Sequence, residues 1–299
     1  MTRKESGNPR SWCWLDGEVT AATEAHIGIV DRGLLYGDSV FETFRTLHRR
    51  GIFVEAHLDR LSQGARLLKI ELEYDQEFLQ EAIEQVIRCH PDDEDVVIRI
   101  TLTRGDRLGG EVGPRSCRSR LMVSSSALAD SSIGDTAGVS AVVVSHRKIP
   151  PCCINPNVKS GNYLSSILAR DEAEICGADE GILLSPDGFV TEAACSNLFW
   201  ISEGQVYTCS DDLVLAGITR SKVLEILEQI GIPCHLGHHR CEHLESASAA
   251  FLTGSIRGII PIRSLQHRLL DDAKGLALID QLSDQYWKEV EESISRSVR

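Results

Sequence analysis

Two residues of this chain have the side chains and the setting for covalent chemistry. They are Lys159, in the segment 157–164, and Glu192, between two apolar runs. A lysine amine can condense with an aldehyde to a Schiff base and can then move a proton between carbon and nitrogen. A carboxylate that faces a pyridine nitrogen keeps it protonated, so the ring can accept an electron pair. The pair indicates pyridoxal 5'-phosphate as cofactor, with Lys159 as the catalytic residue, although each residue singly also fits a solvated surface charge.

A wider resemblance is carried by five segments that span most of the chain. They run in order from Asp-Arg-Gly-Leu-Leu-Tyr-Gly-Asp-Ser-Val-Phe-Glu at residues 31–42 to Phe-Leu-Thr-Gly-Ser-Ile-Arg-Gly-Ile-Ile-Pro at residues 251–261. In these segments the chain resembles the class IV, fold-type IV pyridoxal-phosphate enzymes, which include branched-chain aminotransferases, D-amino-acid aminotransferases and aminodeoxychorismate lyases. The resemblance implies an α+β fold of two domains, similar to D-amino-acid aminotransferase, with a small N-terminal α/β domain and a larger C-terminal domain. It also implies a homodimer with a shared active site.

Four residues are candidates for binding the cofactor phosphate. Arg60 lies beside an apolar stripe of helical spacing, and a guanidinium fork matches phosphate oxygens, although composition alone would make it a solvated arginine. Ile218 and Thr219 stand at a predicted helix start, where backbone N–H groups bind anions. Thr219 would also serve as a plain N-cap. The resemblance implies phosphate contacts at these three positions and at Ser255, which lies in a turn of small residues.

Two more residues are expected to contact the cofactor. Tyr163, four residues after the lysine, resembles the tyrosine that meets the phenolic oxygen of the cofactor in branched-chain aminotransferases. Asn197, in the strand predicted after Glu192, is the other. Both belong to the family segments, so these roles are implied by the resemblance.

The substrate side of the site is expected to include Tyr36, Phe41, Arg107 and Gly254. Tyr36 and Phe41 fit core aromatic residues equally well. Arg107 belongs to an expected glycine-rich loop, residues 104–110, in which some relatives carry a carboxylate-binding arginine at the place of Gly109. Arg107 is the nearest substitute, so the residue that binds the substrate carboxylate stays open.

Three functions are compatible with these residues. The leading hypothesis is an aminotransferase that moves an amino group between an amino acid, of branched-chain or D-amino acid type, and a 2-oxo acid. The alternative is an aminodeoxychorismate lyase that releases pyruvate and 4-aminobenzoate, because residues 31–38 and 255–258 look at least as much like lyases. Transaminase relatives often carry a glutamate where this chain has Gly258. A cofactor-binding protein without catalysis is the third, and the presence of both Lys159 and Glu192 argues against it.

The elements that must position these residues follow from periodicity and turn signals. Short polar residues from 124 onward predict a linker, which gives an N-terminal α+β domain of residues 1–125, a linker of residues 126–136 and a cofactor-binding domain of residues 137–299. Hairpins are predicted at residues 12–19 and 181–192, helices near 58–68, 76–89, 163–176 and 219–230, and a strand at 96–103.

Composition restricts the partners and the compartment. The formal net charge is −13, which argues against a nucleic-acid or anionic-membrane surface. The longest apolar runs are far shorter than a membrane span, so a cytoplasmic protein is expected. The ten cysteines lack any C-x-x-C pair and are expected to be reduced. Cysteines and histidines gather at residues 234–243, but their spacing matches no common zinc pattern, so no metal site is expected.

Overall fold

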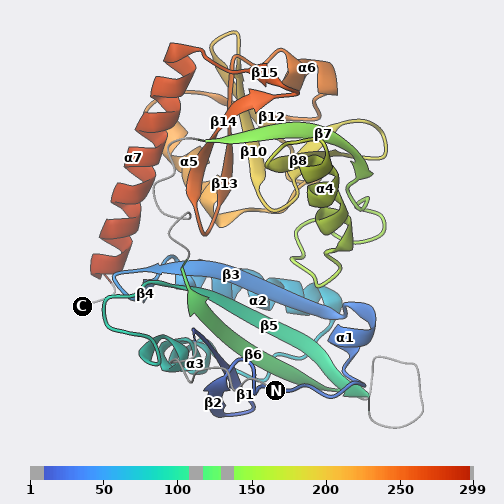
Figure 1. Cartoon of the computed structure of the whole chain (residues 1–299), viewed down its shortest axis with the longest axis vertical. Helices are drawn as coiled ribbons and strands as arrows, with labels where there is room; N and C mark the ends of the chain where they lie inside the picture. The colour runs from blue at the N-terminus through green and yellow to red at the C-terminus, as the bar shows by residue number, and fades with distance from the viewer. Residues whose placement is uncertain (1–9, 108–116, 129–137, 297–299) are drawn as a thin grey trace, which may run out of the picture. The chain divides into compact units, whose positions relative to one another are not determined.

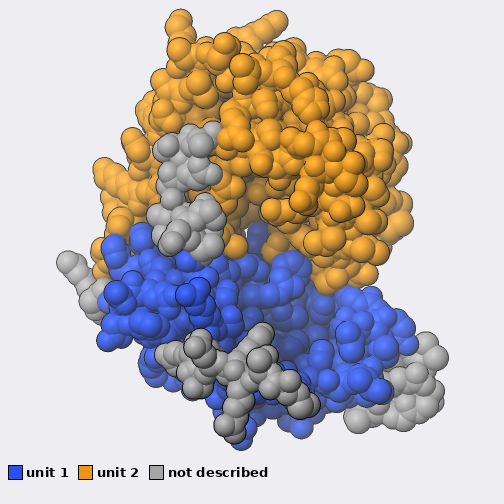
Figure 2. Space-filling model, in the orientation of Figure 1, with its two compact units in different colours: residues 1–129 blue, residues 130–299 orange. Residues whose placement is uncertain are grey.

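The computed structural model describes residues 10–107, 117–128 and 138–296 (Figure 1). The chain divides into two compact units, Met1–Ala129 and Asp130–Arg299 (Figure 2). Each unit has its own sheet and helices. The boundary between the units falls inside the stretch 126–136 that the sequence predicts as a linker. No helix in the described part of the chain is long and apolar enough to span a membrane.

The first unit is built on a six-stranded antiparallel sheet with the strand order β2-β1-β6-β5-β3-β4. The predicted first hairpin is confirmed: its two turn residues, Asp16 and Gly17, both have positive φ, as a two-residue hairpin turn requires. The strands are β1 (Ser11–Leu15), β2 (Glu18–Ala21), β3 (Ser39–Leu47), β4 (Arg50–Gly51), β5 (Val96–Arg107) and β6 (Cys117–Ala127).

The two longer helices of the first unit, α2 and α3, are amphipathic and pack on this sheet. Leu58, Leu61 and Ala65 are buried and recur on one face of α2, which contacts β3. Each leucine buried in this way contributes about 1.5–3 kcal/mol relative to an exposed one. Helix α3 contacts β1 and β6. The helices are α1 (Arg32–Tyr36), α2 (Val54–Leu68) and α3 (Gln76–Arg88).

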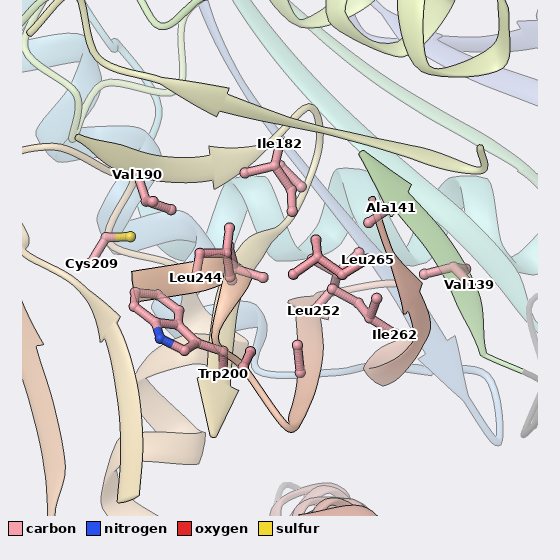
Figure 3. Packing of buried hydrophobic residues seen from close by; sticks show 14 of the residues in the cluster. Val139, Ala141, Ile182, Val190, Trp200, Cys209, Leu244, Leu252, Ile262 and Leu265 are labelled. Atoms are coloured by element: carbon pink, nitrogen blue, oxygen red, sulfur yellow. The ribbon is translucent and has the colours of Figure 1, made fainter. Parts of the chain in front are cut away.

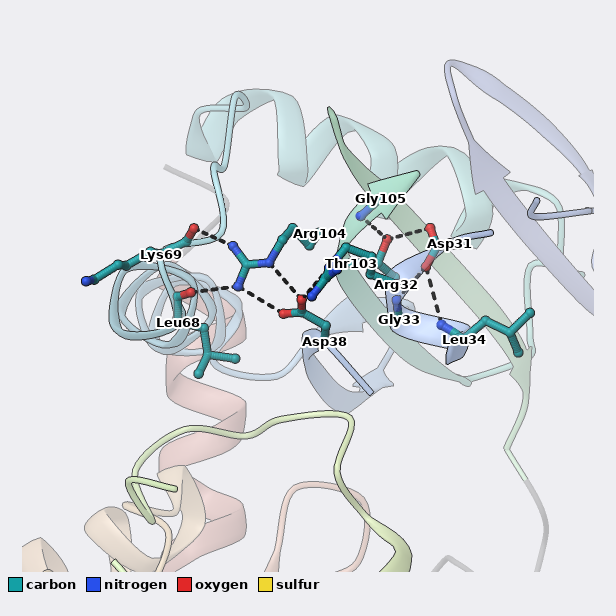
Figure 4. Close-up of polar contacts among 10 residues, drawn as sticks. All are labelled: Asp31, Arg32, Gly33, Leu34, Asp38, Leu68, Lys69, Thr103, Arg104 and Gly105. Atoms are coloured by element: carbon teal, nitrogen blue, oxygen red, sulfur yellow. Dashed lines mark hydrogen bonds and ion pairs between the residues drawn. The ribbon is translucent and has the colours of Figure 1, made fainter. Parts of the chain in front are cut away.

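A polar network ties α1 to the sheet (Figure 4). The Asp31 carboxylate caps α1 and accepts a hydrogen bond of 2.8 Å from the Thr103 hydroxyl. The Arg104 guanidinium donates to Asp38 at 2.8 and 2.9 Å and to the carbonyl of Leu68 at 2.8 Å. Arg104 therefore joins the end of α2 to the segment that enters β3.

Two segments differ from the sequence-based expectation. Residues 104–107, expected in a loop, continue β5 beyond a register shift between Thr103 and Asp106. Residues 124–126, expected to begin the linker and partly assigned to it, lie in β6, which ends at Ala127. Ser125 is buried there, and its hydroxyl is 2.9 Å from His90 Nε2. Strand pairing and one buried partner outweigh the loop preference of serine.

The second unit contains a nine-stranded mixed sheet with the order β12-β11-β10-β13-β14-β7-β8-β9, and β15 pairs with β14. The pairs β11–β12, β14–β7 and β7–β8 are parallel, and the others are antiparallel. The strands are β7 (Val139–Arg147), β8 (Glu180–Leu184), β9 (Val190–Ala193), β10 (Asn197–Ser202), β11 (Gln205–Cys209), β12 (Cys234–Gly237), β13 (Ala249–Gly254), β14 (Gly258–Leu265) and β15 (Arg268–Leu269).

An apolar cluster holds this sheet together on one face (Figure 3). It contains Trp200, Leu252 and Ile262, each at most 1% exposed, from three neighbouring strands. Helix α4 contacts β7 and β8, α5 contacts β13 and α7, and α7 also contacts β14. The helices are α4 (Leu164–Ile175), α5 (Ile218–Gln229), α6 (Cys241–Glu245) and α7 (Ala273–Arg296).

Candidate active site

The lysine loop connects β7 to α4 and is held by its own backbone. The N–H of Val158 donates to the carbonyl of Asn155 at 3.0 Å, and the side chain of Asn157 accepts a hydrogen bond of 3.1 Å from the N–H of Ala216. Ser160, next to Lys159, is buried, and its N–H donates to the carbonyl of Val158 at 2.9 Å. Lys159 therefore lies in a fixed turn. The side chain of Asn157 ties this turn to the segment that leads into α5.

Tyr163 lies close to Lys159 and binds the residue that directly follows β9, the strand that contains Glu192. The Lys159 ammonium lies 5.6 Å from the centroid of the Tyr163 ring, and the Tyr163 hydroxyl donates to the carbonyl of Ala194 at 3.2 Å. Burial, and then the neighbouring Cys195 and Glu192, raise the pKa of Tyr163 far above its usual range. The phenol is therefore a stable hydrogen-bond donor at neutral pH.

Glu192 lies on β9, the second strand of a hairpin that the sequence predicts and the structure confirms. Its side chain is 8% exposed. Oε2 accepts hydrogen bonds from Asn197 Nδ2 at 2.8 Å and from the N–H of Leu215 at 3.1 Å, and Oε1 contacts the ammonium of Lys148. The carboxylate is thus buried and oriented by two neutral donors and one cation.

The start of α5 adjoins this acid. Gly217 is the N-cap, and no side chain caps the helix, so Thr219 is not the plain N-cap that the sequence also allowed. A Cβ at Gly217 would lie 1.9 Å from Asn197 Oδ1, so a glycine is needed for the helix start to approach the asparagine. Ile218 and Thr219 are both buried in the first turn. Helix-start N–H groups without a side-chain cap can receive an anion.

The turn after β13 lies beside the same helix start. Thr253 pairs with Asn197 across β13 and β10, and α5 contacts β13. Among the residues that the structure describes, the buried Thr253 Oγ1 has no hydrogen-bond partner. Gly254 follows, with the Ser196 hydroxyl nearby, and Ser255 then begins the turn to β14. This region offers hydroxyl groups next to uncapped backbone donors.

Gly258 has a structural explanation that does not involve substrate. Its φ is +70°, which favours glycine, and an added Cβ would meet the rings of Tyr286 and Trp287 at 3.0 and 3.1 Å. The absence of glutamate at this position therefore follows from the backbone and from packing on α7. It does not by itself favour the lyase alternative.

Arg60 belongs to a buried cluster of the first unit. Its Nε and Nη2 donate to the two oxygens of Glu42 at 2.8 and 2.7 Å, and His57 Nδ1 lies 2.7 Å from Glu42 Oε2. Burial alone would raise the pKa of Glu42, but the bonds from Arg60 and His57 outweigh it and lower the pKa to about 2. The guanidinium is therefore locked in orientation by a permanently ionised partner.

The three substrate candidates of the first unit have different settings. Tyr36 ends α1, is half exposed, and lies 4.9 Å from the guanidinium carbon of Arg32. Phe41 is 4% exposed in β3, under Arg99 at 3.8 Å, as a core aromatic residue would be. The backbone of Arg107 ends β5, while Gly109 lies outside the described residues.

Sequence reasoning assigned no role to several residues near Glu192 and Lys159. Lys148 follows β7 and reaches Glu192 through the pairing of β7 with β8 and of β8 with β9. Asn157 and Gly217 lie inside the family segments and became visible as positioning residues through their contacts. Cys195 lies next to Tyr163, and only its closeness in sequence to Glu192 hinted at this.

The histidine-rich segment 234–243 packs as an aromatic cluster. Trp200 Nε1 donates to His243 Nδ1 at 3.0 Å, and the rings of His239 and His243 lie 5.0 Å apart. Burial and the neighbouring histidines lower the pKa of His239. Within the described ranges no group of three or more potential ligands could hold a metal ion.

The residues of the second unit fit a phosphorylated pyridine aldehyde. Lys159 supplies an amine, Glu192 a buried acid, and the start of α5 an uncapped anion site, and all three are tied together through Asn157, Asn197 and the peptide groups of residues 215 and 216. The unpartnered Thr253 hydroxyl adds a buried donor without another use in the described structure.

Comparisons with known proteins agree with this arrangement. The sequence model of the family described as amino-transferase class IV matches residues 39–265. The branched-chain-amino-acid aminotransferase of Escherichia coli (strain K12) is 30% identical over 274 residues, which cover 89% of this chain and 87% of the relative. A relative from Methanocaldococcus jannaschii is 30% identical over 276 residues, which cover 91% and 94%.

Solved structures show the same fold. The branched-chain aminotransferase of the archaeon Thermoproteus uzoniensis, crystallised with norvaline, has a TM-score of 0.85 at 28% identity and covers 93% of this chain and 94% of its own. The T.th. branched-chain amino acid aminotransferase with pyridoxamine 5'-phosphate has a TM-score of 0.84 at 26% identity, with 93% of each chain covered. The fold-type IV prediction is confirmed, and this chain belongs to the class IV aminotransferases, a family of pyridoxal-phosphate enzymes.

Proposed function

We propose that this aminotransferase moves the amino group of a branched-chain or similar apolar amino acid to a 2-oxo acid. The relatives and solved structures described above are named as branched-chain enzymes, and one of them holds norvaline, an unbranched apolar amino acid. The observation that carries the proposal is the connection of Lys159 to Glu192 through Tyr163 and the segment 215–217, all within one unit.

Four residues of the second unit are proposed to hold pyridoxal phosphate with Lys159. Glu192 would face the ring nitrogen, the start of α5 at Ile218 and Thr219 would receive the phosphate, and Ser255 would add a hydroxyl. When bound, this cofactor supplies an aldehyde for the amine and a ring that accepts electrons. The acid is held in orientation because neutral donors bind Oε2 while Lys148 contacts Oε1.

Lys159 and Tyr163 are proposed to handle protons. Lys159 carries an amine on a flexible stem from a fixed loop, so it could take a proton from the α-carbon of a bound amino acid and deliver it to the cofactor carbon on the other side of the amino nitrogen. Tyr163, which burial keeps protonated, donates a hydrogen bond next to the amine. Asn197 donates to Glu192 Oε2 at 2.8 Å and to the carbonyl of Leu215 at 2.9 Å, and so would help to hold a ring that faces Glu192.

The residues proposed from the family motifs of the first unit are Arg60 as a phosphate ligand and Tyr36, Phe41 and Arg107 on the substrate side. Support for Arg60 is its fixed orientation, since Glu42 holds the fork in two hydrogen bonds. R60K would keep the charge and lose the fork, so we expect about 10-fold weaker cofactor binding with little change in kcat. Gly254, in the second unit, is the remaining residue proposed to lie on the substrate side of the site.

A second copy of this chain is proposed as the partner. Helix α4, directly after the lysine loop, exposes Leu164, Ile167, Leu168 and Ile175, at 68%, 53%, 40% and 79%. An apolar face of this kind on one helix is typical of an association surface. Light scattering at micromolar concentration should give the mass of a dimer, and I175D with L164D should shift it towards the monomer.

Two measurements test the proposed function: covalent trapping of the cofactor on Lys159, and the rate of amino transfer. Incubation with pyridoxal phosphate followed by borohydride reduction should label Lys159, and K159A should lose the label and at least about 10³-fold in amino transfer from leucine to 2-oxoglutarate. K222A, at an exposed pair with Glu225, is the control and should retain both. Pyruvate release from aminodeoxychorismate without amino transfer would contradict the proposal, as would full turnover in K159A.

A further inference from the structure

Lys148 is a cation next to the acid of the proposed cofactor site. It follows the last residue of β7, and its N–H donates to the carbonyl of Leu184 at 3.0 Å, which fixes its backbone against β8. Its ammonium contacts Oε1 of Glu192. Its side chain is 22% exposed and that of Glu192 8%, so the pair is shielded from water on the carboxylate side.

The two oxygens of Glu192 are occupied unequally. Oε2 receives the N–H of Leu215 and the amide of Asn197, whereas Oε1 receives Lys148. Each carboxylate oxygen has two lone pairs, so Oε1 retains one acceptor position. A ring nitrogen that donates to Glu192 would share Oε1 with the ammonium, and the two positive charges would lie close together in a poorly solvated site.

Other groups around Glu192 do not compensate this charge. Tyr163, before α4, and Cys209, on β11, are two described titratable groups that feel the charge of Glu192, and burial raises the pKa of both, so both are neutral at physiological pH. Asn197 on β10 is uncharged. Arg220 on α5 is engaged by Asp211 at 2.7 Å and by the carbonyl of Cys209 at 2.8 Å.

We propose that Lys148 is a positioning residue that tunes the cofactor through Glu192. Its ammonium shares the carboxylate with the ring nitrogen and weakens the hold of that nitrogen on its proton. The inference rests on the proposed function, because it assigns a role to Lys148 in the site that Lys159 and Glu192 form. The consequence is a ring whose protonation changes closer to neutral pH than one facing an unshared carboxylate would.

The experiment follows the ring nitrogen directly. The protein is loaded with ¹⁵N-labelled pyridoxal phosphate, and the ¹⁵N chemical shift and the visible absorption are recorded against pH for the natural chain, K148M, K148Q and K148R. We expect the ring-nitrogen pKa to rise by about one unit in K148M and K148Q, where a like charge has been removed, and to return towards the natural value in K148R. K222M is the matched control for loss of a surface lysine charge.

The outcomes separate the inference from the function that it rests on. Unchanged ring-nitrogen titration in folded, cofactor-loaded K148M would overturn the role of Lys148 and leave the function intact, since the lysine would then be a counter-ion of Glu192 alone. K148Q behaving as the natural chain would overturn it too, because a hydrogen bond without charge would suffice. Failure of the natural chain to label Lys159 would overturn the function itself. If K148M unfolds, K148Q against K148R decides the same question.

Discussion

Two buried glutamates, one in each unit, show how differently a carboxylate can be held. Glu42 of the first unit is fully buried and receives a guanidinium fork from Arg60 and the ring of His57. Glu192 of the second unit receives two neutral donors and a lysine ammonium. The first set is rigid, because Arg60 donates from two nitrogens of one plane. The second set includes a single point charge on a flexible stem, which can share its acceptor.

The difference separates a structural cluster from a chemical one. Removing one partner of a buried pair leaves an uncompensated charge and costs stability. Both carboxylates receive three of the donors described above, so the kind of donor is what differs: the flexible ammonium at Glu192 can share its oxygen with a further donor, such as a ring nitrogen, whereas the planar fork at Glu42 is fixed. We therefore expect changes at Glu42 to act on folding and changes at Glu192 to act on catalysis, and this contrast can be broken in four ways.

The largest expected effect is on catalysis, from E192Q. The amide keeps the shape and an acceptor oxygen, but it cannot hold a positive ring nitrogen protonated, so we expect kcat for amino transfer to fall by about 10³-fold. The midpoint of thermal unfolding should change by no more than a few degrees. Steady-state kinetics and a thermal melt on one preparation check both, and normal turnover in E192Q would break the comparison on its functional side.

The second effect is on stability, from Glu42. Its pKa is about 2 in the folded protein and 4.5 when unperturbed, so the folded state favours the ionised form. The stabilising contribution is fully present above pH 4.5 and is lost as the pH falls from about 4.5 to about 2. E42Q removes it at neutral pH, and we expect the free energy of unfolding to fall by about 3 kcal/mol because Arg60 and His57 lose their counter-charge.

Urea unfolding at several pH values measures this effect. The natural chain should lose stability through the acid range more steeply than E42Q does. E81Q is the control, since Glu81 pairs with Arg88 at the surface, where both side chains are more than half exposed. It should change stability by less than about 1 kcal/mol. Equal losses in E42Q and E81Q would show that burial of Glu42 adds nothing.

Glu192 could be predicted from the sequence as a site residue, but its partner Lys148 could not. Glu192 could be identified because it belongs to a family segment that also contains Asn197, and the hairpin that carries it has a clear turn signal. Lys148 could not, since its contact with Glu192 depends on the register of three strands, which local patterns do not encode. The same limit explains residues 124–126, whose polar character indicated a linker while their pairing in β6 was invisible.

Phe41 and Arg60 illustrate a second limit on what can be predicted from the sequence. The helix predicted near residues 58–68, which contains Arg60, is α2, whereas no strand was predicted for the segment of Phe41, which lies in β3. Composition could not decide whether Phe41 packs in the core or lines a site, because an aromatic side chain does both. Glu42 was part of a recognised motif, yet its role as the partner of Arg60 appears only when β3 and α2 are packed together.

The third effect tests the neutral donors at Glu192, through G217A. The added methyl would lie 1.9 Å from Asn197 Oδ1 and would push the carboxamide away from both Glu192 and Leu215. We expect a loss of about 2 kcal/mol in stability and weaker binding of inorganic phosphate at the helix start. The double variant with N197A should cost less than the sum of the single changes, because the clash is gone. If the losses in free energy of unfolding were additive, the effect of G217A would not come from the clash with Asn197.

The smallest effect sharpens the comparison with a third carboxylate, Glu172 on α4. Burial alone would raise its pKa, but the donors from Ser145 and His146 together outweigh burial and lower the pKa to about 2, the same value as for Glu42. Its side chain, however, is 24% exposed, so water screens these interactions and solvates the charge when they are lost. We expect E172Q to lower the free energy of unfolding by less than about 1 kcal/mol. It should also change the loss of stability at acid pH far less than E42Q does. Urea titrations at pH 7 and pH 4 measure both. An equal loss in free energy of unfolding for E172Q and E42Q would contradict this prediction. A lowered pKa alone would then predict the stabilising effect of a glutamate, and the burial of Glu42 would not distinguish it from Glu172.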